Sequence, residues 1–178
     1  LAANATAAMA FGTTTIASAS AMMTWIFFDR INGRKISALG ACIGAVVGLV
    51  AITPGCGYVS IAESIFIGFI TAIVSNMAVN WKKLKSVDDT LDVFACHGIG
   101  GIMGMILTAI FARGENASLL HGGVGVFAHH MTALLLVSVF TFFGALVIYK
   151  ITDFIIPLRV EETSEELGLD ISQHNESI

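Results

Sequence analysis

Five long stretches of the chain contain no lysine, arginine, aspartate or glutamate, and this feature limits the chain to a membrane fold. They cover residues 1–28, 36–62, 64–81, 93–112 and 116–149. A helix needs about 20 apolar residues to cross the hydrocarbon core of a bilayer, so each stretch can form a transmembrane helix. The composition agrees, because 12% of the residues are charged, whereas soluble domains contain about 25%.

The sequence therefore predicts an all-α, polytopic membrane helix bundle with five transmembrane helices. The predicted spans are residues 2–29, 36–53, 58–81, 89–112 and 123–150, within a bundle that covers residues 1–158. Residues 159–178 form an acidic tail that contains six of the 13 acidic residues. Because the chain does not start with methionine, we expect it to be the downstream part of a longer protein.

The positive residues predict how the chain is oriented. Lysine and arginine mark the cytoplasmic loops of membrane proteins. Eight of the nine follow the first, third and fifth spans, and only Arg113 falls on the opposite side. The eight are Arg30, Arg34, Lys35, Lys82, Lys83, Lys85, Lys150 and Arg159. We expect a multi-pass protein of the cell membrane with a cytoplasmic C-terminal tail and Leu1 on the outer side.

Several function classes find no support in the sequence. The basic residues form no cluster that would indicate a nucleic-acid partner. The three cysteines, Cys42, Cys56 and Cys96, follow no metal-ligand spacing, and their odd number fits no disulfide framework. Cys96 and His97 are adjacent, and successive helical residues point about 100° apart, so they do not form a nucleophile and base. We expect no enzyme activity, no metal and no cofactor.

A single histidine interrupts the fourth span, in the segment DVFACHGIGG (92–101). Counted from Asp89, His97 lies about 12 Å into a hydrocarbon core of about 30 Å. Ionisable residues at such depth usually face the bundle interior or a polar pathway. A neutral imidazole offers one donor and one acceptor, which suits a small polar solute such as ammonia or water. The alternative is a packing histidine that hydrogen-bonds a neighbouring helix.

The residues around His97 allow two interpretations as well. Steps of three and four residues place Val93, Gly100, Gly101, Gly104 and Thr108 on the histidine's helical face. The glycines either line a narrow passage or let another helix pack closely.

Three aspartates precede the histidine. Asp88 or Asp89 is expected to cap the first turn of the fourth span, where an acidic residue is favoured. Asp92 lies one turn deeper, and we expect it at the cytoplasmic mouth.

Four segments, in order along nearly the whole chain, are similar to the ammonium transporter family (Amt/Mep/Rh). They are AANATAAMAF (2–11), LGACIGAVVGLVAITPGCGY (39–58), VDDTLDVFACHGIGGIMG (87–104) and GLDISQH (168–174). The resemblance implies ammonium or ammonia transport through a narrow apolar pore. It also implies an eleven-helix fold of which this chain is the C-terminal part, and a homotrimer with one pore in each subunit.

The resemblance further implies roles for individual residues. His97 would be the second of two pore histidines in mid-membrane, and Val93 and Val46 would line the apolar conduit. The first histidine, an aromatic gate and an outer recruitment site belong to earlier helices of the family. Ammonium would give up its proton outside, and ammonia would cross along the histidines.

The tail resembles the family less closely. Family tails contact a neighbouring subunit and influence a PII-type regulatory protein, which implies a regulatory role for Gly168, Asp170 and His174. The chain continues QHNESI, with Asn175 where the family has glycine and with no aromatic end. The alternative is a solvated acidic tail.

Two other functions remain open from the residues. His97 with His129 or His130 of the fifth span would suit a haem-binding membrane subunit. Their estimated depths differ by about 9 Å, which counts against this pairing. The other alternative is a structural or assembly subunit.

Overall fold

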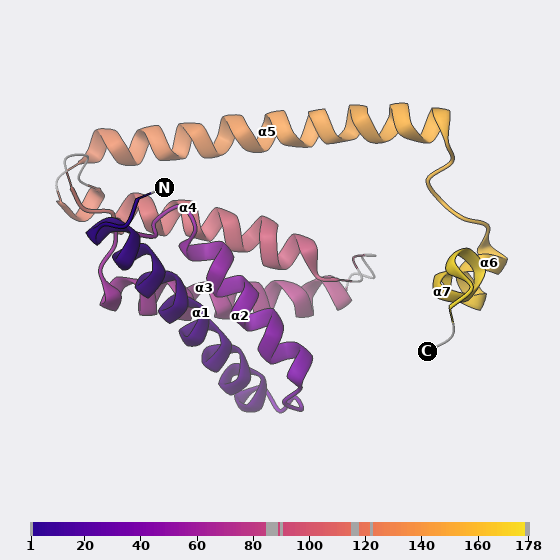
Figure 1. Ribbon diagram of the computed structural model, residues 1–178, viewed down its shortest axis with the longest axis horizontal. Coiled ribbons are helices and arrows are strands. Elements are labelled where there is room, and N and C mark those ends of the chain that lie inside the picture. Colours follow the sequence, from indigo (N-terminus) through magenta and orange to yellow (C-terminus); the bar gives the residue numbers. More distant parts are fainter. Residues whose placement is uncertain (1, 85–88, 90, 115–117, 122, 177–178) are drawn as a thin grey trace. The chain divides into compact units, whose positions relative to one another are not determined.

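The computed structural model describes residues 2–84, 89, 91–114, 118–121 and 123–176. Over these residues all regular structure is helical (Figure 1), which confirms the predicted all-α fold. The elements are α1 (Ala5–Ile31), α2 (Ala38–Ile52), α3 (Ile61–Leu84), the π-helix η1 (Phe94–Ile99), α4 (Gly100–Phe111), the 3-10 turn η2 (Leu119–His121), α5 (Val124–Ile155), α6 (Glu162–Leu167) and α7 (Leu169–His174).

Several of these helices have the length and apolarity of membrane spans. The segments Ile61–Trp81, Phe94–Phe111 and Val124–Ile155 are each long and apolar enough to cross a membrane. α2 is a shorter apolar helix of 15 residues, and α1 has 27 residues. The helices thus fall within or close to the five uncharged stretches, while the positions of the membrane boundaries stay predictions.

The structure divides into two compact units, Leu1–Leu134 and Leu135–Ile178. In the first unit α1 packs against α2 and α3, and α4 packs against α2 and α3. In the second unit the C-terminal part of α5 is followed by α6 and α7, which pack against each other. The predicted boundary between bundle and tail at residue 158 stays a prediction.

Small residues bring α1, α2 and α3 close together. One residue in four is buried along α1, which is the spacing of one helix face. The buried residues of α1 are Thr13, Ala17, Ala21 and Trp25. A Cβ at Gly48 of α2 or at Gly68 of α3 would overlap the backbone carbonyl of Ala17. Both helices therefore reach the α1 backbone only because these positions are glycine.

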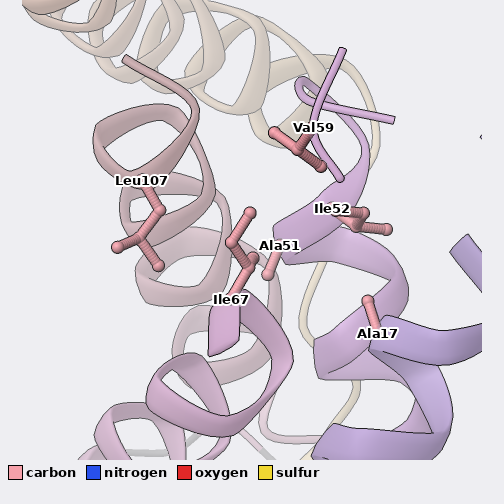
Figure 2. Close-up of a cluster of buried hydrophobic side chains, with 6 residues drawn as sticks. All are labelled: Ala17, Ala51, Ile52, Val59, Ile67 and Leu107. Atoms are coloured by element: carbon pink, nitrogen blue, oxygen red, sulfur yellow. The ribbon is translucent and has the colours of Figure 1, made fainter. Parts of the chain in front are cut away.

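A cluster of buried apolar side chains joins α1, α2, α3 and α4. Its fully or almost fully buried members are Ala17, Ala51, Ile52, Val59, Ile67 and Leu107. Figure 2 shows Ala51 of α2 and Ile67 of α3 lying together, with Leu107 of α4 beside them. In a bilayer such contacts act through close van der Waals packing, because lipid tails are as apolar as the side chains.

Candidate functional site

A π-helical turn contains His97. η1 covers Phe94–Ile99 and runs directly into α4, where the N–H of Gly100 donates to the carbonyl oxygen of His97. η1 contacts α2, α3 and α4. A π-helix has a wider turn than an α-helix, and such turns are frequent at functional sites. The histidine is therefore part of an irregular turn that three helices hold.

Two aspartates shape the start of this turn. The Asp89 carboxylate accepts hydrogen bonds from the backbone N–H groups of Val93 at 2.9 Å and Phe94 at 3.0 Å. Asp92 has a φ of 55°, in the left-handed region where aspartate is one of the few tolerated residues. Its side chain is buried, with 9% of the residue exposed. Asp88, the other predicted cap, lies outside the described residues.

The three residues predicted to line a conduit are all exposed in this chain. Val93 is 50% exposed and Val46 is 39% exposed. His97 is also exposed, whereas its neighbour Cys96 is buried. Val93 directly precedes η1, His97 lies within it, and Val46 belongs to α2, which η1 contacts. The described chain thus presents an imidazole next to apolar surface.

Two of the three glycines of α4 are buried, whereas His97 is exposed. Gly100, Gly104 and Thr108 are buried, in contrast to His97. A Cβ at Gly104 would overlap the backbone carbonyl of Ala51 in α2. A π turn changes the step between His97 and the residues that follow it, so the shared helical face stays a prediction. Gly104 therefore serves close packing of α4 on α2.

Polar groups gather at the end of the bundle where Asp92 lies. Arg34 Nε is 2.7 Å from Asp29 Oδ1, and the amide of Asn76 donates to the same oxygen at 3.0 Å. Arg34 also donates to the side-chain oxygen of Asn76, which is only 1% exposed. These groups and Asp92 line a cavity of about 190 Å³. This cavity forms a polar end to the otherwise apolar bundle.

The opposite end of the bundle contains a second polar group. Arg113 Nη2 is 2.6 Å from Glu63 Oε1, and this hydrogen bond raises the pKa of Arg113. A cavity of about 430 Å³ next to Arg113 is lined by Thr108 and by His130 of α5, among others. The described residues that line it do not include His97. The haem alternative, which pairs His97 with His129 or His130, therefore gains no support from this cavity.

The three predicted regulatory residues of the tail lie in one helical pair. Gly168 separates α6 from α7 and has a φ of 95°, Asp170 is in the first turn of α7, and His174 is in its last turn. The Ser172 hydroxyl donates to the carbonyl of Ser164 at 3.1 Å and so connects the two helices. Asn175 has a φ of 54° after α7. Asparagine tolerates this left-handed conformation, which explains how it can stand where glycine is expected.

Sequence reasoning missed the two polar groups at the ends of the bundle. It used Arg34 and Arg113 only as markers of orientation. The pair of Glu63 and Arg113 could have been found, because each residue stands next to an uncharged stretch. An acidic and a basic residue at the ends of two neighbouring spans suggest an ion pair. The partner Asn76 had no comparable signal, since it is an uncharged residue inside an apolar stretch.

Comparisons with known proteins place these features in context. A model of the Ammonium Transporter Family matches residues 1–178. The chain is 40% identical to an ammonium transporter of Bacillus subtilis (strain 168) over 94% of the chain and 43% of that protein. It is 36% identical to ammonium transporter Amt1 of Archaeoglobus fulgidus over 99% of the chain and 46% of that protein. The chain therefore spans a little less than half the length of these curated relatives.

Solved structures show the same similarity in three dimensions. The crystal structure of Saccharomyces cerevisiae Mep2 matches with a TM-score of 0.86 and 30% identity, over 96% of the chain and 41% of that protein. A structure described as a sensor Amt protein matches with a TM-score of 0.81 and 26% identity, over 96% of the chain and 43% of that protein.

Proposed function

The chain belongs to the Ammonium Transporter Family, and we propose that it is the C-terminal part of a membrane protein that conducts ammonia or ammonium past His97. The homologues are named ammonium transporters, which favours transport over enzyme activity. The observation on which this proposal rests is that His97 is exposed on a π turn and that Val93, which directly precedes this turn, is exposed as well.

The chemistry of this arrangement suits a small solute that both donates and accepts hydrogen bonds. A neutral imidazole has one N–H donor and one bare nitrogen, so it can replace part of the hydration that ammonia loses. The apolar neighbours Val93 and Val46 provide no cage of oxygens of the kind that a metal cation needs. An uncharged permeant is therefore favoured over an alkali ion.

The rest of the conduit would come from the remainder of the transporter. Val46, Val93 and His97 are exposed in this chain, so a second wall is needed to enclose a solute. We propose that helices preceding this segment supply it, together with a partner histidine, an aromatic gate and the outer recruitment site. Ammonium would release its proton on the outer side, and ammonia would pass along the two histidines.

The assembly and regulation are proposed from the same family membership. The complete protein would be a homotrimer in the cell membrane, with the tail and the Asp92 end in the cytoplasm. Gly168, Asp170 and His174 would take part in regulation, with a PII-type protein as partner. The relative described as a sensor Amt protein is compatible with regulatory roles in this family.

The test of this proposal uses the complete transporter, purified and reconstituted in lipid vesicles. An inward ammonium gradient should change the internal pH or drive a current in vesicles with protein and not in empty vesicles. The same preparation should show no Soret absorption. A Soret band together with absent ammonium flux would replace this function with the haem-binding alternative.

A further inference from the structure

The carboxylate of Asp89 accepts two hydrogen bonds at the start of the turn that contains His97. Its Oδ1 lies 2.9 Å from the backbone nitrogen of Val93, and its Oδ2 lies 3.0 Å from that of Phe94. The first N–H groups of a helix have no partner within the helix, so both groups need an acceptor from outside. A carboxylate suits this role, because its bonds to N–H groups are charge-assisted and the helix dipole favours an anion there.

The main chain of Asp89 also contacts the segment that leads into the turn. Its carbonyl oxygen accepts from the N–H of Asp92 at 3.1 Å, and the carbonyl oxygen of Asp92 accepts from the N–H of Cys96 at 2.9 Å. Asp92 has a φ of 55°, so the chain enters the turn from a left-handed residue. Asp89 therefore holds the N-terminal side of the turn through both its side chain and its backbone.

Packing holds another side of the same turn. Ala95 is fully buried, and Cys96 is 4% exposed. Both belong to a cluster with Trp25 of α1 and Val47 of α2. His97 is the next residue along the chain and is exposed. The direction of each side chain depends on how the turn is rotated about its axis, so whatever fixes the start of the turn also sets the direction of His97.

We propose that Asp89 is a positioning residue, which fixes the π turn Phe94–Ile99 and thereby the direction in which His97 points. Single π turns are rare within helices, and an unfavourable backbone arrangement persists only where the surrounding structure fixes it. Without the Asp89 carboxylate the N–H groups of Val93 and Phe94 lose this acceptor, and the segment can adopt the α-helical step. The effect on transport rests on the proposed function, whereas the effect on the turn does not.

The first test is a structure of the complete transporter with Asp89→Ala. We expect the hydrogen bonds of residues 94–99 to change to the α-helical pattern and the His97 side chain to move. Asp89→Asn keeps one acceptor oxygen and should change the turn less. Asp153→Ala is the matched control, because the Asp153 carboxylate accepts from the backbone N–H of Leu158 at 3.1 Å, in the second unit. An unchanged π turn in Asp89→Ala would overturn the proposal, whatever the transport activity.

The second test is a double-mutant cycle in reconstituted vesicles, with ammonium flux normalised to correctly assembled protein. Asp89→Ala should lower the flux about fivefold, the factor that corresponds to loss of a typical helix cap. In a His97→Ala background the same substitution should lower the flux no further, because the side chain that it positions is gone. A loss of stability alone would reduce the amount of assembled protein and leave the flux per molecule unchanged.

The two backgrounds separate this proposal from the proposed function. If His97→Ala lowers the flux and Asp89→Ala has the same effect in both backgrounds, Asp89 does not act through His97 and the proposal is overturned. If His97→Ala keeps wild-type flux, the proposed function fails, and the structure of Asp89→Ala alone decides whether Asp89 fixes the turn.

Discussion

Arg113, just after the end of α4, forms an ion pair with Glu63 in the first turn of α3, with 2.6 Å between Nη2 and Oε1. The same carboxylate accepts the backbone N–H of Ser60 at 2.6 Å, and the Ser60 hydroxyl accepts the N–H of Glu63 at 3.3 Å. This reciprocal pair is a capping box. Glu63 therefore caps the start of α3 and connects this helix to the end of α4.

Loss of this connection should weaken the bundle. Arg113→Ala removes three hydrogen bonds to a carboxylate whose side chain is only 14% exposed, so the melting temperature of the detergent-purified protein should fall. The melting temperature should fall less for Arg113→Lys, because lysine keeps the positive charge and loses only the planar guanidinium group. Arg159→Ala is the control, since its pair with Glu165 is far more exposed. Equal melting temperatures for Arg113→Ala and wild type would contradict the role given to Glu63.

A second prediction concerns the close packing of α2 against α1 at Gly48. Gly48→Ala places a methyl against the carbonyl of Ala17 and the Cα of Ser18, and backbone atoms cannot move aside as a flexible side chain can. We expect destabilisation of about 1–3 kcal/mol or more, as for other overpacked sites. Gly12→Ala is the matched control, because its nearest neighbour is the tip of Ile61 at 3.6 Å. Yield of folded protein and melting temperature measure the difference, and two equally stable variants would disprove the packing argument.

The polar group around Asn76 makes a third prediction. Asn76→Ala leaves Arg34 and Asp29 without their buried amide partner, which should cost about 1–3 kcal/mol. Asn32→Ala is the comparison, because Asn32 makes one exposed hydrogen bond to Phe28. Denaturation of both variants in one detergent should show the larger loss for Asn76→Ala. If Asn32→Ala is the more destabilising change, the hydrogen bonds of Asn76 to Arg34 and Asp29 do not stabilise the bundle.

Labelling tests the predicted orientation. In a cysteine-free background, His121→Cys lies in η2 and Asn32→Cys follows α1, and both positions are exposed. An impermeant thiol reagent applied to intact cells should label only His121→Cys, because the lysines and arginines assign the Asn32 side to the cytoplasm. Labelling of Asn32→Cys alone would reverse the assignment.

The uncharged stretches were sufficient to predict an all-α fold, which the described residues confirm. α1 and α2 fall within one or two residues of the predicted span ends at most termini, because loops with charge, proline or glycine bound them. α5 differs, since it continues to Ile155, past the predicted end at residue 150. α5 contains Lys150 and Asp153, because a helix tolerates single charged residues at low cost. The first charge after an apolar stretch therefore does not mark the end of the helix.

The irregular turn at His97 could not be predicted from the sequence. A π turn leaves no periodic signal in a segment that is apolar on nearly all sides, so the α-helical step was applied through it. The left-handed Asp92 and the contacts of Gly100 with Ser75 depend on packing between distant segments. The sequence pattern identified His97 as the residue of interest and grouped it with Gly100 and Gly104, which are buried here.

The proposed function requires that His97 acts on the permeant. His97→Ala removes the donor and acceptor that replace lost hydration, at a cost of about 1–3 kcal/mol. Flux should therefore fall by about one to two orders of magnitude. His97→Glu places a carboxylate in the conduit, which can hold a cation, and should shift the protein toward carrying ions.

The decisive measurement is ammonium flux and ion current in vesicles that contain the complete transporter, normalised to correctly assembled protein. We predict reduced flux per assembled molecule for His97→Ala and a current carried by ammonium or potassium for His97→Glu. Wild-type flux per molecule for His97→Ala, together with unchanged ion selectivity for His97→Glu, would show that His97 is a packing residue and would contradict this account.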